Sequence, residues 1–435
     1  MKPIDNSFWF KLRVIMAHKD VLRNHCKPIT NWYIKRFRRS QLQAAHKLKG
    51  KSCLEVAFFL SVPGMWKHDA LFEAMRSNSR YHPYVVVFPY STYKEYDKEE
   101  LRRMLQRTYE FIVNKGYECV IPYDEKKRKW IDVKKVYSPD FVFFTSPYKD
   151  MIPDYYIYHY RDTLTGYLPY AFTSMNFYKV NYDLIFMNLV GLYFVETPLH
   201  KQFAEKYARN HGANTVVTGY PATEVFLDKN YHPKDLWKPQ SHPKKRVIYA
   251  PHHSVDTDHN STFLEYCDLI FDLADRYRDS IQFVFKPHQT LKVKLQQIWG
   301  VEKTEEYYQK WDELENTQLV NDGYEDLFLT SDALIHDSGS FTTEYLFVKK
   351  PVMYLCRNTE MKEKFNDFGQ KSFECHYHWF SFDDINGFLR EVVLKGEDPM
   401  KEQREQFYSD YLSPIDDTMP SRKILEVIEK TIEGD

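Results

Sequence analysis

The expected fold rests on one run of sequence, SDALIHDSGSFTTEY at residues 331–345. Its segment 333–335 is a short apolar run of the size of a buried parallel strand. The Asp, Ser and Gly residues at 337–340 offer helix-capping side chains and one position free to adopt a positive φ. Apolar residues then recur at helical spacing over 341–348. The run therefore predicts a strand, a polar loop and a helix.

A loop of this kind lies at the carboxyl end of a strand and the amino end of a helix. Open α/β sheets bind phosphates there, because free N–H groups and the helix dipole both point at the ligand. For a single loop, a helix cap without a ligand is the simpler explanation. Two further polar loops of the same type upstream favour a binding site.

Length and composition narrow the protein class. The chain has 435 residues, more than one hydrophobic core usually organises, so we expect two domains. Only 14 residues are glycine, and neither G-x-G-x-x-G nor the P-loop motif is present, which argues against the common glycine-rich nucleotide loops. The six cysteines are scattered without C-x-x-C pairs, as in a reducing cytosol. The run CHYH at 375–378 offers metal-type ligands that are too crowded for an ordinary zinc site.

Apolar segments predict a cytoplasmic location. The amino-terminal region lacks the apolar stretch of a signal peptide. The longest apolar run, residues 184–195, is too short to span a bilayer, and we expect it to form a buried strand or helix.

Residues 1–51 form a basic segment with thirteen Lys or Arg residues against two Asp and no Glu. Aromatic residues, among them Trp9 and Trp32, are interleaved with the basic ones. An amphipathic helical arm of this composition suits an anionic membrane surface, so we expect a peripheral protein on the inner face of the cell membrane. A basic, solvated helix packed on the next domain is an equal alternative. The rest of the chain gives no support to a nucleic-acid partner.

Strands and helices alternate along the chain from residue 52. We expect strands at 54–60, 84–88, 119–121, 141–144, 165–172 (with its following loop), 215–218, 247–250, 281–285, 333–335 and 351–355. Beyond Ser381 the pattern indicates helices only. The alternation predicts two Rossmann-like α/β domains, 52–196 and 197–380, that face one another across a cleft. The arm 1–51 precedes them and a helical tail, 381–435, follows.

Three strand ends in the second half deliver polar groups: His252 with His253, Lys286 with His288, and the run 337–340. If these strands are parallel neighbours, their carboxyl ends share one edge and the side chains converge. Lys286 can neutralise a phosphate, and His288 can donate to a phosphoryl oxygen or protonate a leaving group. No Asp cluster at metal-ligand spacing accompanies them. We therefore expect no required cofactor, with Mg²⁺ as the open alternative.

The third loop can hold a second phosphate. Ser338, Ser340 and the N–H groups around Gly339 are the expected cradle, and Thr342 completes the expected phosphate-binding set.

The runs YAPHHS at 249–254, KPH at 286–288 and the segment 331–345 resemble the CDP-glycerol glycerophosphotransferase family. This family includes the teichoic acid polymerases and relatives in bacterial capsule and surface-polysaccharide clusters. Fainter similarity, at 219–221 and 66–69, extends the resemblance to residues 53–356. It implies a two-domain GT-B fold and the transfer of a polyol phosphate from CDP-glycerol or CDP-ribitol, with release of CMP. Glycerol phosphate is the first expectation.

Carried over to this chain, the resemblance implies that Lys286 and His288 sit at the donor pyrophosphate. Asp337 and Ser340 fall on the family's D-x-S-S loop, in which Gly339 replaces the first Ser.

The resemblance also bears on the sugar contact and the base. Glu344 falls where many members have Asp, and is implied to contact ribose or polyol hydroxyls. The family's polymerases carry a W-H-G loop whose His is implied to activate the acceptor hydroxyl, but this chain has Pro-Tyr-Ala at 169–171 instead. His252 or His253 is our expectation for the base, and His159 is a further candidate. A capping or core role for these histidines stays equally open.

On the acceptor side we expect contacts from Trp66, Asp69, His159 and Tyr170. A buried Trp beside a capping Asp is the simpler interpretation of the first two. The acceptor is implied to be a hydroxyl of a glycan or of a lipid-linked glycan. Two rival functions stay open. A GT-B glycosyltransferase would bind a nucleotide sugar in the same pocket, and a non-catalytic scaffold of a polysaccharide assembly complex would use the basic arm and a degenerate fold.

Overall fold

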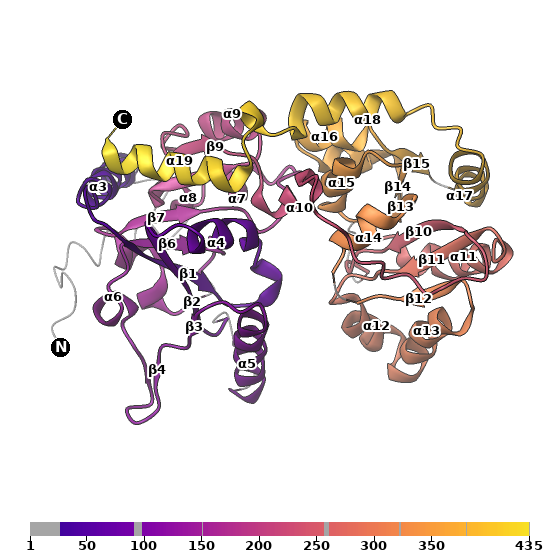
Figure 1. Cartoon of the computed structure of the whole chain (residues 1–435), viewed down its shortest axis with the longest axis horizontal. Helices are drawn as coiled ribbons and strands as arrows, with labels where there is room; N and C mark the ends of the chain where they lie inside the picture. The colour runs from indigo at the N-terminus through magenta and orange to yellow at the C-terminus, as the bar shows by residue number, and fades with distance from the viewer. Residues whose placement is uncertain are drawn as a thin grey trace. The chain divides into compact units, whose positions relative to one another are not determined.

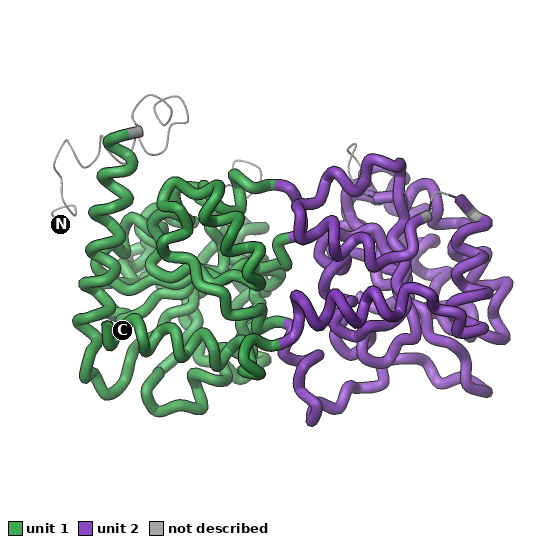
Figure 2. Tube along the Cα trace, turned by 90° about the horizontal axis from the view of Figure 1, so that it is seen from above, with its two compact units in different colours: residues 1–173, 177–222, 414–435 green, residues 174–176, 223–413 purple. Residues whose placement is uncertain are grey.

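The computed structural model describes residues 27–90, 98–149, 151–255, 261–321, 323–379 and 381–434. The chain divides into two compact units (Figure 2). Unit 1 comprises residues 1–173, 177–222 and 414–435, and unit 2 comprises residues 174–176 and 223–413. Residues 1–26 of the predicted basic arm lie outside the described part of the chain.

Unit 1 is built on a seven-stranded sheet with the order β3-β2-β1-β6-β7-β8-β9, and every pairing is parallel. Its strands are β1 (Leu54–Leu60), β2 (Tyr81–Val87), β3 (Cys119–Val120), β6 (Phe141–Phe144), β7 (Leu164–Tyr167), β8 (Leu192–Val195) and β9 (Thr215–Val217). The central strands β1, β6, β7 and β8 are apolar and buried almost throughout, as expected when helices cover both faces of a parallel sheet. A small antiparallel pair, β4 (Tyr123–Asp124) and β5 (Lys129–Trp130), lies apart from this sheet.

The helices of unit 1 come from three parts of the chain. They are α3 (Lys27–His46), α4 (Asp69–Arg76), α5 (Lys98–Asn114), α6 (Val133–Val136), α7 (Tyr178–Tyr182), α8 (Ile185–Leu189), α9 (Pro198–Tyr207) and α19 (Pro420–Glu433), with 3-10 turns at Pro63–Met65, Pro153–Tyr155, Ile157–Tyr160 and Ile415–Asp417. The last helix, α19, packs against α3 and α4 (Figure 1). It buries Ile424, Ile428 and Ile432, which recur every four residues on one face.

The division between the units falls later than the predicted boundary at 196/197. β8 pairs with β7 and β9 pairs with β8, so the segment up to residue 222 belongs to the sheet of unit 1. The predicted helical tail also divides: 381–413 belongs to unit 2 and 414–435 to unit 1. The apolar run 184–195 forms both α8 and the buried strand β8.

Unit 2 is built on a six-stranded parallel sheet with the order β12-β11-β10-β13-β14-β15. Its strands are β10 (Lys245–Ala250), β11 (Ile281–Phe285), β12 (Thr317–Leu319), β13 (Ala333–His336), β14 (Val352–Leu355) and β15 (Tyr377–Trp379). The two parallel sheets confirm the predicted α/β class with two Rossmann-like halves. The outer strands β12 and β15 were not expected from the sequence.

The helices of unit 2 are α10 (Glu224–Leu227), α11 (Phe263–Arg276), α12 (Leu291–Trp299), α13 (Val301–Glu313), α14 (Glu325–Thr330), α15 (Phe341–Glu344), α16 (Asp367–Phe373), α17 (Phe382–Gly387) and α18 (Lys401–Phe407). Short 3-10 turns lie at Pro221–Thr223, Tyr345–Val348 and Thr359–Lys364, and π-helical turns at Phe388–Leu394 and Tyr408–Leu412. The main core joins the sheet to α11 and α13, with Trp311 stacked on Phe285 at a centroid distance of 5.0 Å.

The run 331–345 departs from its expected geometry after the strand. β13 forms as predicted, but α15 has only four residues and continues as a 3-10 turn that ends at Lys349 with φ 59°. Ser340 makes no side-chain cap, and Gly339 does not adopt a positive φ. The helix is therefore much shorter than predicted and lacks the expected cap, while phosphate binding by this loop stays a prediction. Aromatic packing fixes this turn instead, with Phe341 and Tyr345 5.0 and 4.8 Å from Phe328.

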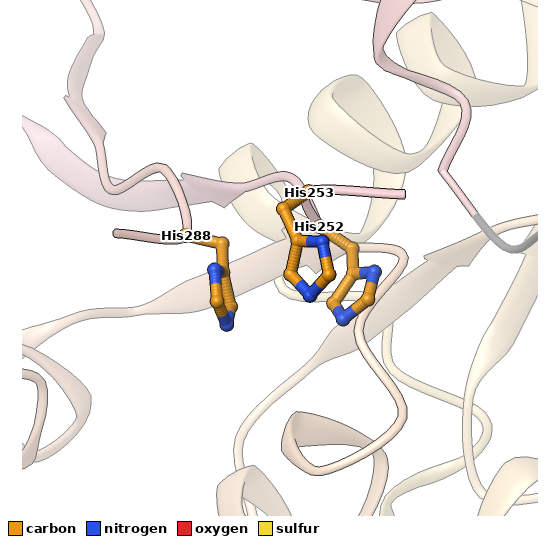
Figure 3. A group of neighbouring side chains, drawn as sticks. All are labelled: His252, His253 and His288. Atoms are coloured by element: carbon orange, nitrogen blue, oxygen red, sulfur yellow. The ribbon is translucent and has the colours of Figure 1, made fainter. Parts of the chain in front are cut away.

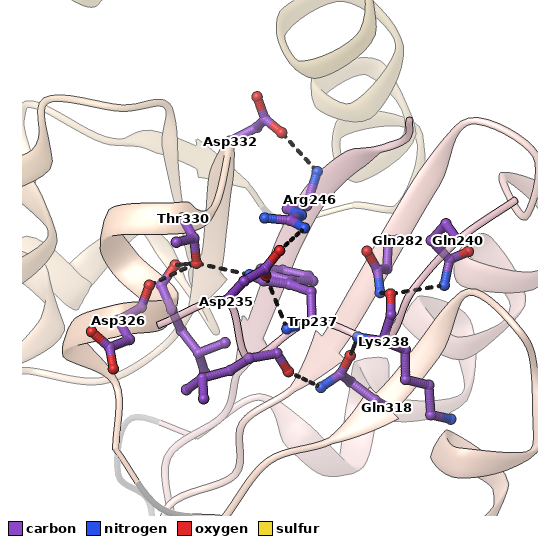
Figure 4. A network of polar contacts seen from close by, with 12 residues as sticks. Asp235, Trp237, Lys238, Gln240, Arg246, Gln282, Gln318, Asp326, Thr330 and Asp332 are labelled. Carbon is purple, nitrogen blue, oxygen red and sulfur yellow. Dashed lines mark hydrogen bonds and ion pairs between the residues drawn. The ribbon is translucent and has the colours of Figure 1, made fainter. Parts of the chain in front are cut away.

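Residues 229–245 are rich in Lys, His and Pro, a composition that predicts a surface loop, but they are partly built into unit 2. Trp237 is only 5% exposed, and its Nε1 donates to Thr330 Oγ1 at 2.9 Å. Gln318 on β12 accepts from the Lys238 N–H at 2.5 Å and donates to the Leu236 carbonyl at 2.8 Å. We call the polar set of Figure 4 the amino-edge network; it comprises Asp235, Trp237, Lys238, Gln240, Arg246, Gln282, Gln318, Asp326, Thr330 and Asp332.

Candidate functional site

The three predicted polar loops leave the sheet of unit 2 at one edge. β10 lies between β11 and β13, and the pairs Tyr249–Phe285 and Ala250–His336 place the carboxyl ends of the three strands level. The loops are also joined by their backbones, since the His288 N–H donates to the Pro251 carbonyl at 3.1 Å. The expectation that these strands are parallel neighbours is confirmed.

His252, His253 and His288 form what we call the histidine cluster. The ring centroids lie 4.2 Å apart for the first two, 4.3 Å for His253 and His288, and 5.3 Å for His252 and His288. Figure 3 shows the rings side by side, each with its outer nitrogen turned away from the backbone toward the same side. One nitrogen from each ring lies within 4.8 Å of the others, and within the described residues no second group of three metal-type ligands is this compact.

Hydroxyl groups orient two of these rings. His252 Nδ1 lies 2.8 Å from Ser254 Oγ, and His288 Nδ1 lies 3.0 Å from Thr290 Oγ1. The backbone N–H groups of Ser254 and Thr290 approach the same ring atoms at the longer distances of 3.3 and 3.2 Å. Each contact spans two residues, so each of these two rings is held by its own loop. Sequence reasoning missed these two hydroxyls, although a His followed at the second position by Ser or Thr occurs in both motifs.

The electrostatic surroundings keep His288 neutral. Loss of solvent around the imidazole, together with the nearby charges of His253, Lys286 and Lys294, lowers the pKa of His288 to about 4. Part of the ring remains exposed to solvent. At neutral pH this imidazole therefore offers one N–H donor and one lone pair.

Lys286 lies beside the cluster at the end of β11. The residue is 8% exposed, and its ammonium donates to the Asn321 carbonyl at 2.9 Å. The contact holds the charge near the loop that follows β12. Burying an ammonium is costly unless it is hydrogen-bonded, so the Asn321 carbonyl stabilises the charged side chain of Lys286 at this position.

Asp337 points into unit 2. It is 1% exposed; Oδ1 accepts from the His252 N–H at 2.5 Å, and Oδ2 accepts from the Thr262 N–H and hydroxyl at 2.6 and 3.1 Å. Burial raises the pKa of Asp337 to about 6. The carboxylate therefore positions the loop that carries the cluster. The expected direct contact of this group with a phosphate does not fit this geometry.

The rest of the third loop is tied largely to its own unit. The Ser338 N–H donates to His336 Nδ1 at 3.1 Å, and the buried Thr342 hydroxyl donates to the Ser338 carbonyl at 2.9 Å. Gly339 is held by the Ser174 hydroxyl, which donates to its carbonyl at 2.8 Å. Ser340 stays partly exposed and approaches Ser338 Oγ at 3.4 Å.

Two consequences follow for this loop. A Cβ on Gly339 would lie 3.2 Å from Met175 Sδ, which favours Gly there. Glu344 is 2% exposed within α15, a burial that conflicts with its expected contact with polyol or ribose hydroxyls.

The expected acceptor-side residues all belong to unit 1. Trp66 is buried and its Nε1 donates to Asp69 Oδ1 at 2.8 Å, an oxygen that also accepts from Tyr117 at 2.9 Å. His159 Nε2 lies 3.0 Å from Asp132 Oδ1. Tyr170 follows β7 and is partly exposed. The structure thus gives Trp66, Asp69 and His159 partners within their own unit.

Sequence comparison gives a family match. Residues 186–430, more than half of the chain, match a family described as CDP-Glycerol:Poly(glycerophosphate) glycerophosphotransferase. The matched region contains all three polar loops. No protein of curated function matches the chain in a sequence search.

Structure comparison shows the same fold in several enzymes. A single-residue variant of the wall teichoic acid polymerase TagF superposes with a TM-score of 0.57 at 12% identity, covering 95% of this chain and 97% of that one. A UDP-N-acetylglucosamine 2-epimerase gives 0.55 at 16% identity, over 88% and 97% of the two chains. The UDP-GlcNAc 2-epimerase from Neisseria meningitidis gives 0.51 at 13% identity, over 87% and 100%. These likenesses agree with the predicted GT-B architecture.

Proposed function

The chain belongs to the CDP-glycerol:poly(glycerophosphate) glycerophosphotransferase family of enzymes, and on this premise we propose that it transfers glycerol phosphate from CDP-glycerol to a hydroxyl of a cell-surface glycan or lipid-linked acceptor, releasing CMP. Membership supports transfer of a polyol phosphate from a CDP-activated donor in general. One observation carries the finer proposal. Within the matched region, two neighbouring strand ends bring Lys286, His288, His252 and His253 to a single edge, next to the loop after β13.

The donor pyrophosphate is proposed to bind at Lys286, His288 and the partly exposed end of the third loop around Ser340. Lys286 would offset the negative charge of the phosphates, so this part of the mechanism calls for no resident metal. His288 would donate a hydrogen bond to a phosphoryl oxygen. Its lowered pKa favours this role over protonation of the leaving group, because a neutral imidazole has no additional proton to give.

The acceptor hydroxyl is proposed to lose its proton to His252 or His253 and to attack the polyol-bearing phosphorus in line. A new P–O bond forms to the acceptor while the P–O bond to CMP breaks, so the electron pair of that bond leaves with CMP. The contact of His252 with Ser254 fixes the ring orientation, which a general base needs. Proton transfer by a positioned imidazole contributes about 10²–10⁴-fold in rate.

A peripheral position on the inner face of the membrane is the proposed location. Helix α3 buries one face in unit 1, where Gln41 donates to the Tyr160 and Thr163 carbonyls. The opposite face is exposed and combines apolar with basic side chains, namely Ile29, Trp32, Lys35, Arg36, Arg39 and Leu42. Such a face suits an anionic lipid surface. In the described part of the chain, no helix has the length and apolar character needed to span a bilayer.

The test is CMP release from purified protein supplied with CDP-glycerol or CDP-ribitol and a membrane or glycan extract as acceptor. We expect release that depends on both donor and acceptor, with phosphorus found in the product. Consumption of UDP- or GDP-sugars without CMP release would replace the proposal by a sugar transferase. If no nucleotide is released from any donor, with extracts of several surface glycans as acceptors, the result would indicate a non-catalytic scaffold.

A further inference from the structure

We infer that the histidine cluster is a binding site for one divalent transition-metal cation of the zinc type, coordinated by the Nε2 atoms of His252, His253 and His288. Three imidazole nitrogens that converge on one position are a known ligand set for Zn²⁺, Co²⁺ and Ni²⁺. The site would be open, because three protein ligands leave a fourth position for an oxygen ligand. The metal site itself does not depend on the proposed transfer reaction.

Distance is the first support. One nitrogen of each ring lies within 4.8 Å of the other two. In a tetrahedral site with Zn–N bonds of 2.0–2.1 Å, ligand nitrogens lie about 3.4 Å apart. The rings therefore need to approach by no more than about 1.4 Å, which small side-chain rotations provide. Figure 3 shows the outer nitrogens already turned toward one side.

The surrounding hydroxyls are the second support. A metal-binding imidazole normally donates its other N–H to a protein acceptor, which fixes the tautomer and ring orientation. Ser254 Oγ and Thr290 Oγ1 lie 2.8 and 3.0 Å from the Nδ1 atoms of His252 and His288. The backbone N–H groups of Ser254 and Thr290 also approach these Nδ1 atoms, at 3.3 and 3.2 Å, so metal binding selects the tautomer in which Nδ1 donates to the closer hydroxyl and Nε2 carries the lone pair.

The backbone adds a third support. The buried carboxylate of Asp337 accepts from the His252 N–H, and the His288 N–H donates to the Pro251 carbonyl. Both loops that carry the cluster are therefore anchored close together before any ligand binds. A preorganised ligand set loses little conformational entropy on binding.

The inference changes how the cluster would act in the proposed reaction, and this consequence does rest on that proposal. An imidazole whose lone pair binds a cation cannot accept a proton at the same moment. In the metal-bound state, the cation would instead bind an oxygen of the acceptor or the donor at its open position and increase its acidity or electrophilicity. A metal titration therefore also decides between a free imidazole and a cation as the activating group.

The experiment is a titration of chelator-stripped, full-length protein with Co²⁺, followed by visible absorption, and with Zn²⁺ in competition. No nucleotide or acceptor is present, so failure of the transfer reaction cannot affect the outcome. We expect one Co²⁺ per chain, with the spectrum of a four-coordinate site of three nitrogen ligands and one oxygen ligand, displaced by Zn²⁺. His253→Ala and His288→Ala should each weaken binding by at least about 100-fold, since even loss of an outer hydrogen bond costs 10–100-fold.

His232→Ala is the matched control, because His232 is an exposed histidine of the same unit outside the cluster. It should bind Co²⁺ like the wild type, whereas Ser254→Ala should lose about 10-fold. Equal binding by wild type and His253→Ala, or no binding by the wild type, overturns the inference. If the alanine variants do not fold, X-ray absorption of the zinc-loaded wild type decides: three imidazole ligands are expected, and fewer than three overturn it.

Discussion

The two edges of the unit 2 sheet carry polar side chains in opposite arrangements. Near the amino ends of the strands, the amino-edge network pairs donors with acceptors inside the chain, as when Gln318 uses both ends of its amide on the 235–240 segment (Figure 4). At the carboxyl ends, three imidazoles are gathered against one another beside a buried lysine (Figure 3). The amino edge is built for stability. The carboxyl edge concentrates groups of like chemistry, as a site for an external ligand does.

The largest expected effect is on stability at the amino edge. Trp237→Ala removes a side chain that is 5% exposed, donates to Thr330 and lies under the Arg246 guanidinium. We expect a loss of about 3–5 kcal/mol in the free energy of unfolding, measured by urea denaturation, because a large cavity is left. Leu236→Ala, at an adjacent residue that is 37% exposed, is the control and should change little. The rate of CMP release by the folded fraction should be unchanged. A lower rate would mean that the amino edge of the sheet, and not only its carboxyl edge, takes part in catalysis.

The second effect tests the carboxyl edge. His288→Ala should reduce the rate of CMP release by about 100-fold or more, since a preorganised donor to a developing charge supplies about 2.7–4 kcal/mol. The thermal midpoint should move little, because His288 is exposed. Gln289→Ala, at the next exposed position of the same loop, is the control. A folded Lys286→Ala/His288→Ala double variant that turns over normally would remove both residues from the mechanism.

The third effect measures one polar pair of the amino-edge network. Gln318→Ala leaves the Lys238 N–H and the Leu236 carbonyl without the amide that joins them. We expect a loss of about 1–3 kcal/mol in the free energy of unfolding, the cost of unsatisfied buried polar groups. Urea denaturation provides the measurement, with the partly exposed Gln240 as the comparison site. A change below that of Gln240→Ala would show that the other contacts of the 235–240 segment hold it without Gln318.

The sheet and the edge at which the polar loops meet could be predicted because each signal is local. His252, Lys286 and Asp337 directly follow apolar runs, and parallel strands then bring their ends together. What each side chain does there could not be predicted. Asp337 reads as a phosphate-loop acid, yet its orientation depends on the Thr262 N–H, 75 residues away in sequence.

Other differences have the same physical origin, which is long-range pairing. β9 looks like the start of a second domain, but which sheet a strand joins is decided by its partner, here β8, and not by its own residues. Residues 229–245 are rich in Lys, His and Pro, which indicated a surface loop. The burial of Trp237 within it depends on contacts of this segment with Gln318 and Thr330, which lie far along the chain.

The smallest expected effect is a pH dependence of stability that distinguishes the buried His336 from the histidine cluster at the same edge of the sheet. His336 ends β13 but is fully buried, and burial lowers the pKa of its imidazole to about 3. In the unfolded chain the same imidazole has a pKa near 6.5. The contribution of His336 to the free energy of unfolding is therefore fully present above pH 6.5 and falls as the pH drops toward 3.

Between pH 7 and 5.5 this difference amounts to about 1 kcal/mol. His336→Asn keeps an acceptor for the Ser338 N–H but cannot titrate, so its free energy of unfolding should depend less on pH than that of the wild type, by about that amount. Urea denaturation at the two pH values measures the difference, and His232→Asn is the exposed control. Identical pH dependence in wild type and His336→Asn would mean that His336 can be protonated in the folded state. That result would contradict the distinction between His336, which is buried in the strand, and the solvent-accessible histidine cluster.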